Sequence, residues 1–106
     1  MADTKTDSKT LPQIAPKLDL KPPPLFKVMY INDEVTTMEF VIESLVEYFN
    51  YTAQTAVQIT EDIHTAGSAV VAVLPYEVAE QKGVEVTLAA RAASYPLQIK
   101  LEPESI

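Results

Sequence analysis

The chain has 106 residues, 47% of them apolar and none of them cysteine, which allows one small domain with its own core and excludes disulfides, iron–sulfur clusters and thiol chemistry. Residues 25–106 hold four Lys or Arg against twelve Asp or Glu, a net charge of −8 that argues against DNA or RNA as a partner and suits a cationic ligand or a basic protein surface. There is neither a signal-peptide core nor a run of about 18 apolar residues, so we expect a cytoplasmic protein.

Residues 1–24 differ in composition from the rest of the chain. They contain five of the eight prolines, four Lys and three Asp, and they show no sustained helical or strand period. The run Pro22–Pro24 is typical of a stiff, extended spacer. We therefore expect a flexible N-terminal tail over residues 1–24, followed by one core domain over residues 25–106.

The first half of the core predicts a strand and a helical hairpin. Aromatic and β-branched residues alternate over residues 25–31, which indicates a strand. A helix with one buried face follows from Met38, and Thr36 and Glu39 have the spacing of a capping box at its start. Its apolar positions are Met38, Val41, Ile42, Leu45, Val46 and Phe49. Thr52 is placed to cap a second helix, which passes through His64 and ends at Gly67.

The second half predicts strand, helix and strand. Residues 68–74 form an unbroken apolar run that is consistent with a central strand. Pro75 suits the first position of a third helix, which Pro96 ends, and alternation over residues 97–102 indicates a last strand. The expected buried face of this helix is Val78, Ala79, Val86, Ala89, Ala90 and Ala93. The order β-α-α-β-α-β predicts an α+β fold with three helices on one face of a three-stranded, mostly antiparallel sheet.

Polar side chains gather at the corner between the first strand and the first helix. Asn32, Asp33 and Glu34 form an acidic turn there, and His64 is the only histidine of the chain. An enzyme could pair Asp33 with His64, but there is no persuasive nucleophile. A metal site would have one imidazole and two carboxylates without a recognisable spacing. A binding site needs less, because Asn32, Asp33 and neutral His64 could together hold one small ammonium group.

Several short stretches together resemble the ClpS family, adaptors of the bacterial N-end rule. They are Lys21-Pro22-Pro23, the turn Ile31-Asn32-Asp33-Glu34 with Thr36, Met38, Glu39, Phe40 and Val41 after it, His64 with Gly67, Glu77-Val78-Ala79-Glu80, and Tyr95-Pro96-Leu97. The likeness runs in order over about residues 21–103. It implies a monomeric, cofactor-free and metal-free protein without enzymatic activity, which captures substrates with a destabilising first residue (Phe, Tyr, Trp or Leu) and passes them to the ClpA unfoldase of the ClpAP protease.

The resemblance also implies roles for individual residues. Asn32, Asp33 and His64 would bind the substrate's α-amino group. The wall of the hydrophobic pocket would be formed by Thr36, Met38, Val41, Thr60, Ile63 and Leu97. Glu77 and Lys82 would contact the N-terminal domain of ClpA, and the tail would be fed into the unfoldase. Burial of a Leu or Phe side chain, at about 1.5 to 3 kcal/mol, and hydrogen bonds to a charged amine make affinity near micromolar plausible.

Three positions depart from the pattern of the family. Thr37 stands where proline is common, and Val35 where an aromatic residue is frequent, which bears on the ClpA contact. Thr60 stands where a second pocket methionine is often found, so we expect a pocket altered in size or polarity. The alternative class is a general protein-interaction module, since the ribosomal stalk protein has a C-terminal domain of similar architecture. Such a module gives no reason for the combination of Asn32, Asp33 and His64.

Overall fold

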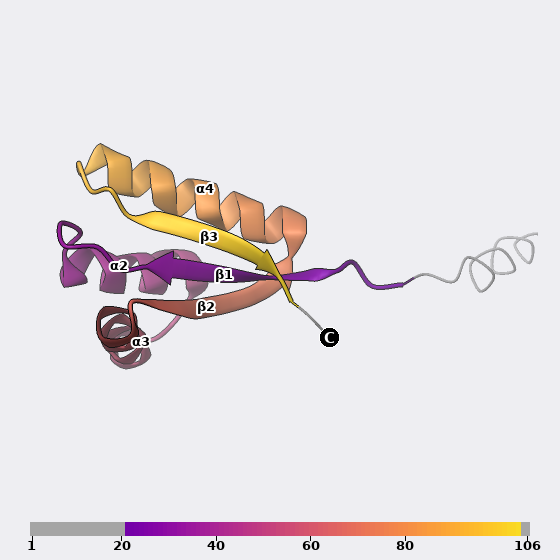
Figure 1. The fold of residues 1–106 in the computed structure, drawn as a ribbon, viewed down its shortest axis with the longest axis horizontal. Coiled ribbons are helices and arrows are strands. Elements are labelled where there is room, and N and C mark those ends of the chain that lie inside the picture. The colour runs from indigo at the N-terminus through magenta and orange to yellow at the C-terminus, as the bar shows by residue number, and fades with distance from the viewer. Residues whose placement is uncertain (1–20, 105–106) are drawn as a thin grey trace, which may run out of the picture.

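The computed structural model describes residues 21–104, so residues 1–20 of the expected tail and the last two residues lie outside the described residues. The elements follow the expected order β-α-α-β-α-β (Figure 1). Their bounds are β1 Leu25–Ile31, α2 Met38–Phe49, α3 Ala53–Ala66, β2 Ser68–Pro75, α4 Tyr76–Ala92 and β3 Gln98–Pro103. The numbering of the helices begins at α2. The predicted α+β fold class is confirmed.

The sheet is antiparallel throughout, and its order is β2-β1-β3. In β1, Leu25 pairs with Pro75 of β2 and Ile31 pairs with Ser68, with a shift of register between Val28 and Met29. The prediction that residues 68–74 form the central strand is wrong, because β1 lies between the other two strands (Figure 1). An unbroken apolar run of strand length does not distinguish a central strand from an edge strand that is only partly covered.

The three helices cover one face of the sheet. Val28 and Tyr30 of β1 are fully buried on this face, and across the sheet Tyr30 pairs with Ala69 and Ile99. The register places Met29 of β1 beside Val70 of β2 on the opposite face. Val70 is 42% exposed, because no helix covers that face. The core therefore lies between the sheet and the helices, as the alternation of residues in β1 predicts.

Helix caps set the ends of α2 and α3. Thr37, not Thr36, is the N-cap of α2, since its hydroxyl accepts a hydrogen bond from the Phe40 N–H (3.1 Å), so the predicted capping box of Thr36 and Glu39 is wrong. Thr52 caps α3 as expected, by accepting from the Thr55 N–H. Gly67 ends α3 at a φ of 91°, a conformation that costs glycine little because it has no Cβ. Both helices of the hairpin are therefore fixed at their starts by threonine.

The α4 helix packs on the sheet with fewer residues than the pattern predicts. Ala79, Val86 and Ala90 are fully buried, but Val78 is 41% exposed and does not belong to the buried face. Pro75 closes β2 and precedes the helix instead of occupying its first turn. The small buried side chains let α4 approach the strands closely. Of the helices within residues 21–104, none combines the length and the apolar character that crossing a bilayer requires.

One buried polar pair lies within the core. The Tyr30 phenol is 2.7 Å from Ser44 Oγ, and Ser44 Oγ donates a hydrogen bond to the carbonyl oxygen of Val41 (2.8 Å). The serine proton is used in that bond, so the Tyr30 hydroxyl donates to Ser44. Burial raises the pKa of Tyr30 well above its usual value, and the hydrogen bond with Ser44 offsets only part of that effect. The pair links β1 to α2, and Tyr30 stands two residues before the acidic turn in the sequence.

Candidate functional site

Residues 32–37 form the corner between the end of β1 and the start of α2. Asn32 donates its backbone N–H to the carbonyl oxygen of Gly67 (2.9 Å), which ties the corner to the C-terminal end of α3. His64 lies in the last turn of that helix and is exposed. Two segments that are about 30 residues apart in the sequence therefore meet at one end of the molecule.

The Asp33 carboxylate organises the turn. Its Oδ1 accepts hydrogen bonds from the backbone N–H groups of Val35 (2.8 Å) and Thr36 (2.7 Å), and its Oδ2 accepts one from Thr36 Oγ1 (2.8 Å). Burial by itself would raise the pKa of Asp33, but these hydrogen bonds and the positive charge of Arg91 hold the pKa of the carboxyl below its usual value. Asp33 is therefore a stable anion at neutral pH. A carboxylate has about four acceptor positions, so one remains for a ligand.

A cavity of about 580 Å³ opens at this corner. It brings together all three expected amine-binding residues and five of the six expected pocket residues. Its lining is Asn32, Asp33, Glu34, Val35, Thr36, Thr37, Met38, Glu39, Val41, Thr60, Ile63 and His64. The carboxylates of Asp33, Glu34 and Glu39 make the potential of the cavity negative, which favours a cationic ligand.

The cavity has a buried apolar floor and an exposed polar rim. Val41, Thr60 and Ile63 are at most 6% exposed, whereas Met38 is 42% exposed, and Asn32 lies at the surface. The Thr60 hydroxyl donates to the carbonyl oxygen of Ala56 (2.7 Å), so its proton is used within its own helix. An apolar group on the floor with an ammonium group at the rim would match this arrangement.

The remaining predicted residues lie outside this cavity. Leu97 is 1% exposed in the core and is not among the lining residues, and Glu77 and Lys82 lie on α4. The hydroxyl of Thr37 donates a hydrogen bond to the hydroxyl of Tyr95 (3.3 Å). The segment that contains Leu97 therefore packs beside the corner without lining the cavity. Arg91 Nη1 donates a hydrogen bond to the carbonyl oxygen of Leu97 (2.9 Å), which links this segment to the last turn of α4.

Four lining residues had no expected role in binding, although Glu34 was expected in the acidic turn. They are Glu34, Val35, Thr37 and Glu39, which line the cavity alongside the predicted residues. All four belong to the turn that holds Asn32 and Asp33 or to the start of α2, and that proximity in sequence is the signal that could have identified them. Within residues 21–104, no three His, Asp or Glu side chains lie close enough to share a metal ion.

Comparison with known families identifies the chain. The model of the family described as ATP-dependent Clp protease adaptor protein ClpS matches residues 21–100, most of the chain. The chain belongs to the ClpS family. As a ClpS-family protein it is an adaptor of the Clp protease and not an enzyme, which confirms the prediction of a non-enzymatic adaptor.

Relatives and a solved structure agree with this assignment. The chain is 43% identical over 98 residues to the ATP-dependent Clp protease adapter protein ClpS of Myxococcus xanthus, covering 92% of each protein. It is 38% identical to ClpS of Acetivibrio thermocellus, covering 91% of this chain and 97% of the relative. The fold matches the structure of Agrobacterium tumefaciens ClpS2 bound to L-phenylalaninamide with a TM-score of 0.76 and 38% identity, covering 78% of this chain and all of that one.

Proposed function

We propose that the cavity at the β1–α2 corner binds the first residue of a substrate protein, with its free α-amino group at the rim and its side chain on the floor. The observation that carries this proposal is the single cavity that joins Asn32, Asp33 and His64 to Val41, Thr60 and Ile63. Anionic Asp33 supplies the charge that an ammonium group needs. The buried floor supplies apolar contact for a side chain such as Phe, Tyr, Trp or Leu.

The structural neighbour supports the chemistry of the ligand. Agrobacterium tumefaciens ClpS2 was solved with L-phenylalaninamide, a molecule that has a free α-amino group and a phenyl side chain. Such a ligand combines the cation and the apolar group that the rim and the floor of this cavity favour. The amide in place of a carboxylate resembles the first peptide bond of a protein. The proposed ligand is therefore an N-terminal residue within a polypeptide.

Binding is tested with three peptides that differ only at the first residue. One begins with free Phe, the second is the same peptide with its amine acetylated, and the third begins with Val. We expect tight binding of the free Phe peptide alone, because acetylation removes the cation and the β-branch of Val fits poorly past Met38 at the rim. Equal binding of all three peptides, or binding of none, would favour a general interaction module without specificity for the N-terminal residue.

We further propose that the captured substrate is delivered to the ClpA unfoldase, and that the adaptor acts as a monomer in the cytoplasm. Glu77 and Lys82 on α4 are the proposed contacts with the N-terminal domain of ClpA, with residues 1–24 as a tail that the unfoldase engages. This surface lies outside the cavity, so substrate capture and delivery are separable. A Glu77→Lys variant should bind the Phe peptide normally and fail to stimulate its degradation by ClpAP. Undiminished degradation would remove Glu77 from the proposed contact.

A further inference from the structure

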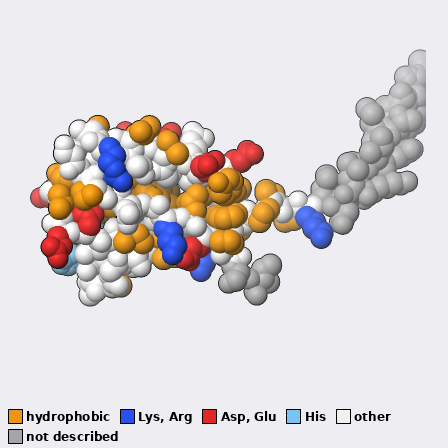
Figure 2. Space-filling view, turned by 45° about the horizontal axis from the view of Figure 1, so that its top comes forward, with side chains coloured by type: hydrophobic (Ala, Val, Ile, Leu, Met, Phe, Trp, Pro, Cys, Tyr) orange, Lys and Arg blue, Asp and Glu red, His pale blue; other side chains and the backbone are white. Residues whose placement is uncertain are grey.

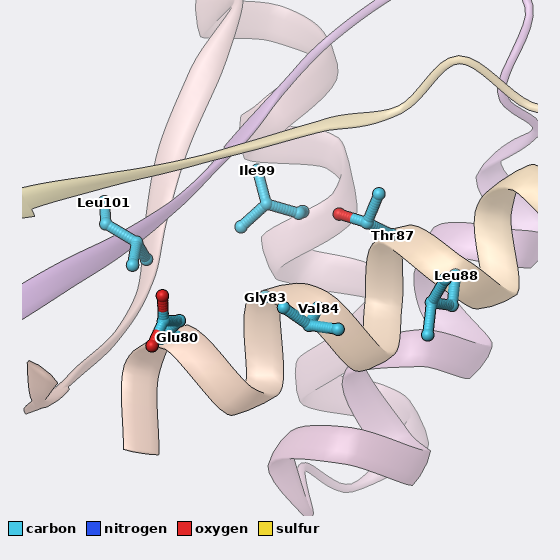
Figure 3. Close-up of a pocket in the computed structure, with 7 residues that line it drawn as sticks. All are labelled: Glu80, Gly83, Val84, Thr87, Leu88, Ile99 and Leu101. Carbon is cyan, nitrogen blue, oxygen red and sulfur yellow. The ribbon is translucent and has the colours of Figure 1, made fainter. Parts of the chain in front are cut away.

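An apolar groove between α4 and β3 lies outside the cavity described above. It has a volume of about 280 Å³ and is lined by Glu80, Gly83, Val84, Thr87, Leu88, Ile99 and Leu101. Figure 3 shows Ile99 and Leu101 projecting from β3 toward α4, with Gly83 of the helix opposite them. Gly83 has no side chain, and a Cβ there would lie 3.6 Å from Ile99 Cγ2, so a longer side chain at this position would extend into the groove.

The groove leaves apolar side chains in contact with solvent. Val84 is 51% exposed. Leu88 is 65% exposed, which is the largest exposed fraction among the large apolar residues of the described part of the chain. Exposed apolar side chains that gather around a groove typically mark a binding surface. Figure 2 shows hydrophobic side chains gathered at the end of the molecule from which residues 21–24 project, with acidic side chains beside them.

We infer that residues Lys17–Lys21 of this same chain bind in the groove between α4 and β3. The described chain starts beside this face, since Pro23 and Pro24 line a hollow together with Pro75, Tyr76 and Val78 at the start of α4. The ring of Phe26 also lies 4.9 Å from that of Tyr76. Pro23 therefore tethers the preceding residues beside the helix that forms one wall of the groove.

The length of the segment matches the length of the groove. From Tyr76 to Leu88, the rise of α4 is about 18 Å. From Pro23 back to Leu18, an extended chain spans about 17 Å. Leu18 would reach Leu88, and Leu20 would lie closer to Glu80 and Leu101. The tether adds a high effective concentration, so a weak contact is sufficient for binding.

The sequence of the segment complements the surface. Lys17-Leu18-Asp19-Leu20-Lys21 alternates, so an extended backbone places both leucines on one side. The groove offers apolar contact to those leucines, and the net charge of +1 of the segment (two Lys and one Asp) complements the negative charge of Glu80 and the neighbouring Glu77. Glu80 keeps its orientation by accepting a hydrogen bond from the Tyr76 hydroxyl (3.2 Å). The inference does not depend on the proposed binding of N-terminal residues, because it concerns a different face.

Paramagnetic relaxation in the full chain tests the inference. The chain has no cysteine, so Ala15→Cys accepts a single spin label. We expect the label to broaden the amide signals of Thr87, Leu88 and Ile99 strongly. Ser substitution at Leu18 and Leu20 should abolish this broadening, whereas Ser substitution at Leu11 and Ile14, the matched control within the same tail, should preserve it. None of the four positions belongs to a strand or helix of the described core, so we expect the amide spectrum of the core to stay unchanged.

Two further measurements separate the alternatives. Gly83→Met fills the groove and should also abolish the broadening, while an unchanged amide spectrum elsewhere shows that the domain is folded. Broadening that persists in Leu18→Ser/Leu20→Ser, or that is equally lost in Leu11→Ser/Ile14→Ser, would overturn the assignment of Lys17–Lys21. Broadening that appears between spin-labelled molecules and separate isotope-labelled molecules would overturn binding within one chain and point to a second copy.

Discussion

Replacing Asp33 by asparagine separates the charge of the carboxylate from its role in the turn. The carboxylate accepts three hydrogen bonds from Val35 and Thr36, and an asparagine oxygen can keep the two from backbone N–H groups. We therefore expect Asp33→Asn to change the free energy of unfolding by less than about 1 kcal/mol. Alanine loses all three bonds, each worth about 0.5 to 1.5 kcal/mol, so Asp33→Ala should destabilise the protein by about 2 kcal/mol.

Substrate binding should respond to the charge itself. A hydrogen bond to a charged group contributes about 1.5 to 3 kcal/mol, and the partial exposure of Asp33 favours the lower part of that range. The dissociation constant for a peptide that begins with free Phe should therefore rise about 10- to 50-fold in Asp33→Asn. Fluorescence anisotropy of a labelled peptide measures this constant, and urea unfolding followed by circular dichroism measures the stability of the same variants.

Glu34→Gln is the matched control for this experiment. Glu34 lines the same cavity, and its substitution by Gln removes the same unit of charge as Asp33→Asn. Glu34 takes no part in the hydrogen bonds that fix Asp33. We expect its dissociation constant to stay within about threefold of that of the wild type, since exposed charges interact weakly through water. An equal loss in both variants would mean that the general negative potential binds the amine. Unchanged binding in Asp33→Asn would refute direct contact with the carboxylate.

Four more predictions concern other parts of the molecule. Gly83→Ala should stabilise the protein by about 1 kcal/mol in urea unfolding, because a Cβ there meets only a 3.6 Å contact and alanine favours helix. Tyr30→Phe should cost about 1 kcal/mol at pH 7, through loss of the bond to Ser44. Since burial raises the pKa of Tyr30, the wild type should lose stability above about pH 10, where an unfolded tyrosine ionises, and the variant should lose less. If His64 accepts a hydrogen bond from the substrate amine, His64→Ala should raise the dissociation constant of a Phe peptide about 3- to 10-fold. Thr60→Met should shrink the floor of the cavity and weaken Trp peptides more than Leu peptides, whereas Thr60→Val, nearly equal in volume, should leave that ranking unchanged.

Each of these predictions has a result that contradicts it. Lower stability of Gly83→Ala would mean that α4 cannot accept a methyl group beside β3. Identical losses of stability at high pH in the wild type and Tyr30→Phe would show that another group is responsible. Unchanged binding in His64→Ala would remove His64 from the amine contact. Equal effects of Thr60→Met on all four N-terminal residues would mean that Thr60 does not set the ranking.

Local pattern was sufficient for the elements and for the acidic turn of the candidate site, whereas the pocket residues were expected only from the resemblance to the ClpS family. Alternation over residues 25–31 predicted the bounds of β1, and the apolar period from Met38 predicted the start of α2. Thr52 and Gly67 predicted the ends of α3, because capping depends on the chemistry of one or two residues. Asn32 and Asp33 were identified as a site candidate because several polar residues follow a strand and precede a helix.

The cap of α2 shows how a nearby hydrogen bond can move a helix cap away from the residue that the sequence pattern predicts. Thr36 and Thr37 are adjacent and chemically alike, and only Thr36 has the spacing to Glu39 that a capping box requires. In the structure the Thr36 hydroxyl donates to Asp33, so the cap is formed by Thr37. The sequence contains both threonines but does not rank the two hydrogen bonds against each other.

By itself the sequence determined the order of the elements, the α+β class, the absence of thiol chemistry and the acidic turn that holds Asn32 and Asp33. Only the tertiary structure decided that β1 is central, that His64 joins that turn, and that Leu97 lies in the core outside the cavity. The physical reason is that hydrophobic period and capping act over a few residues, whereas strand order and cavity walls depend on contacts between distant segments. Buried wall and buried core use the same apolar residue types, so only packing distinguishes the two.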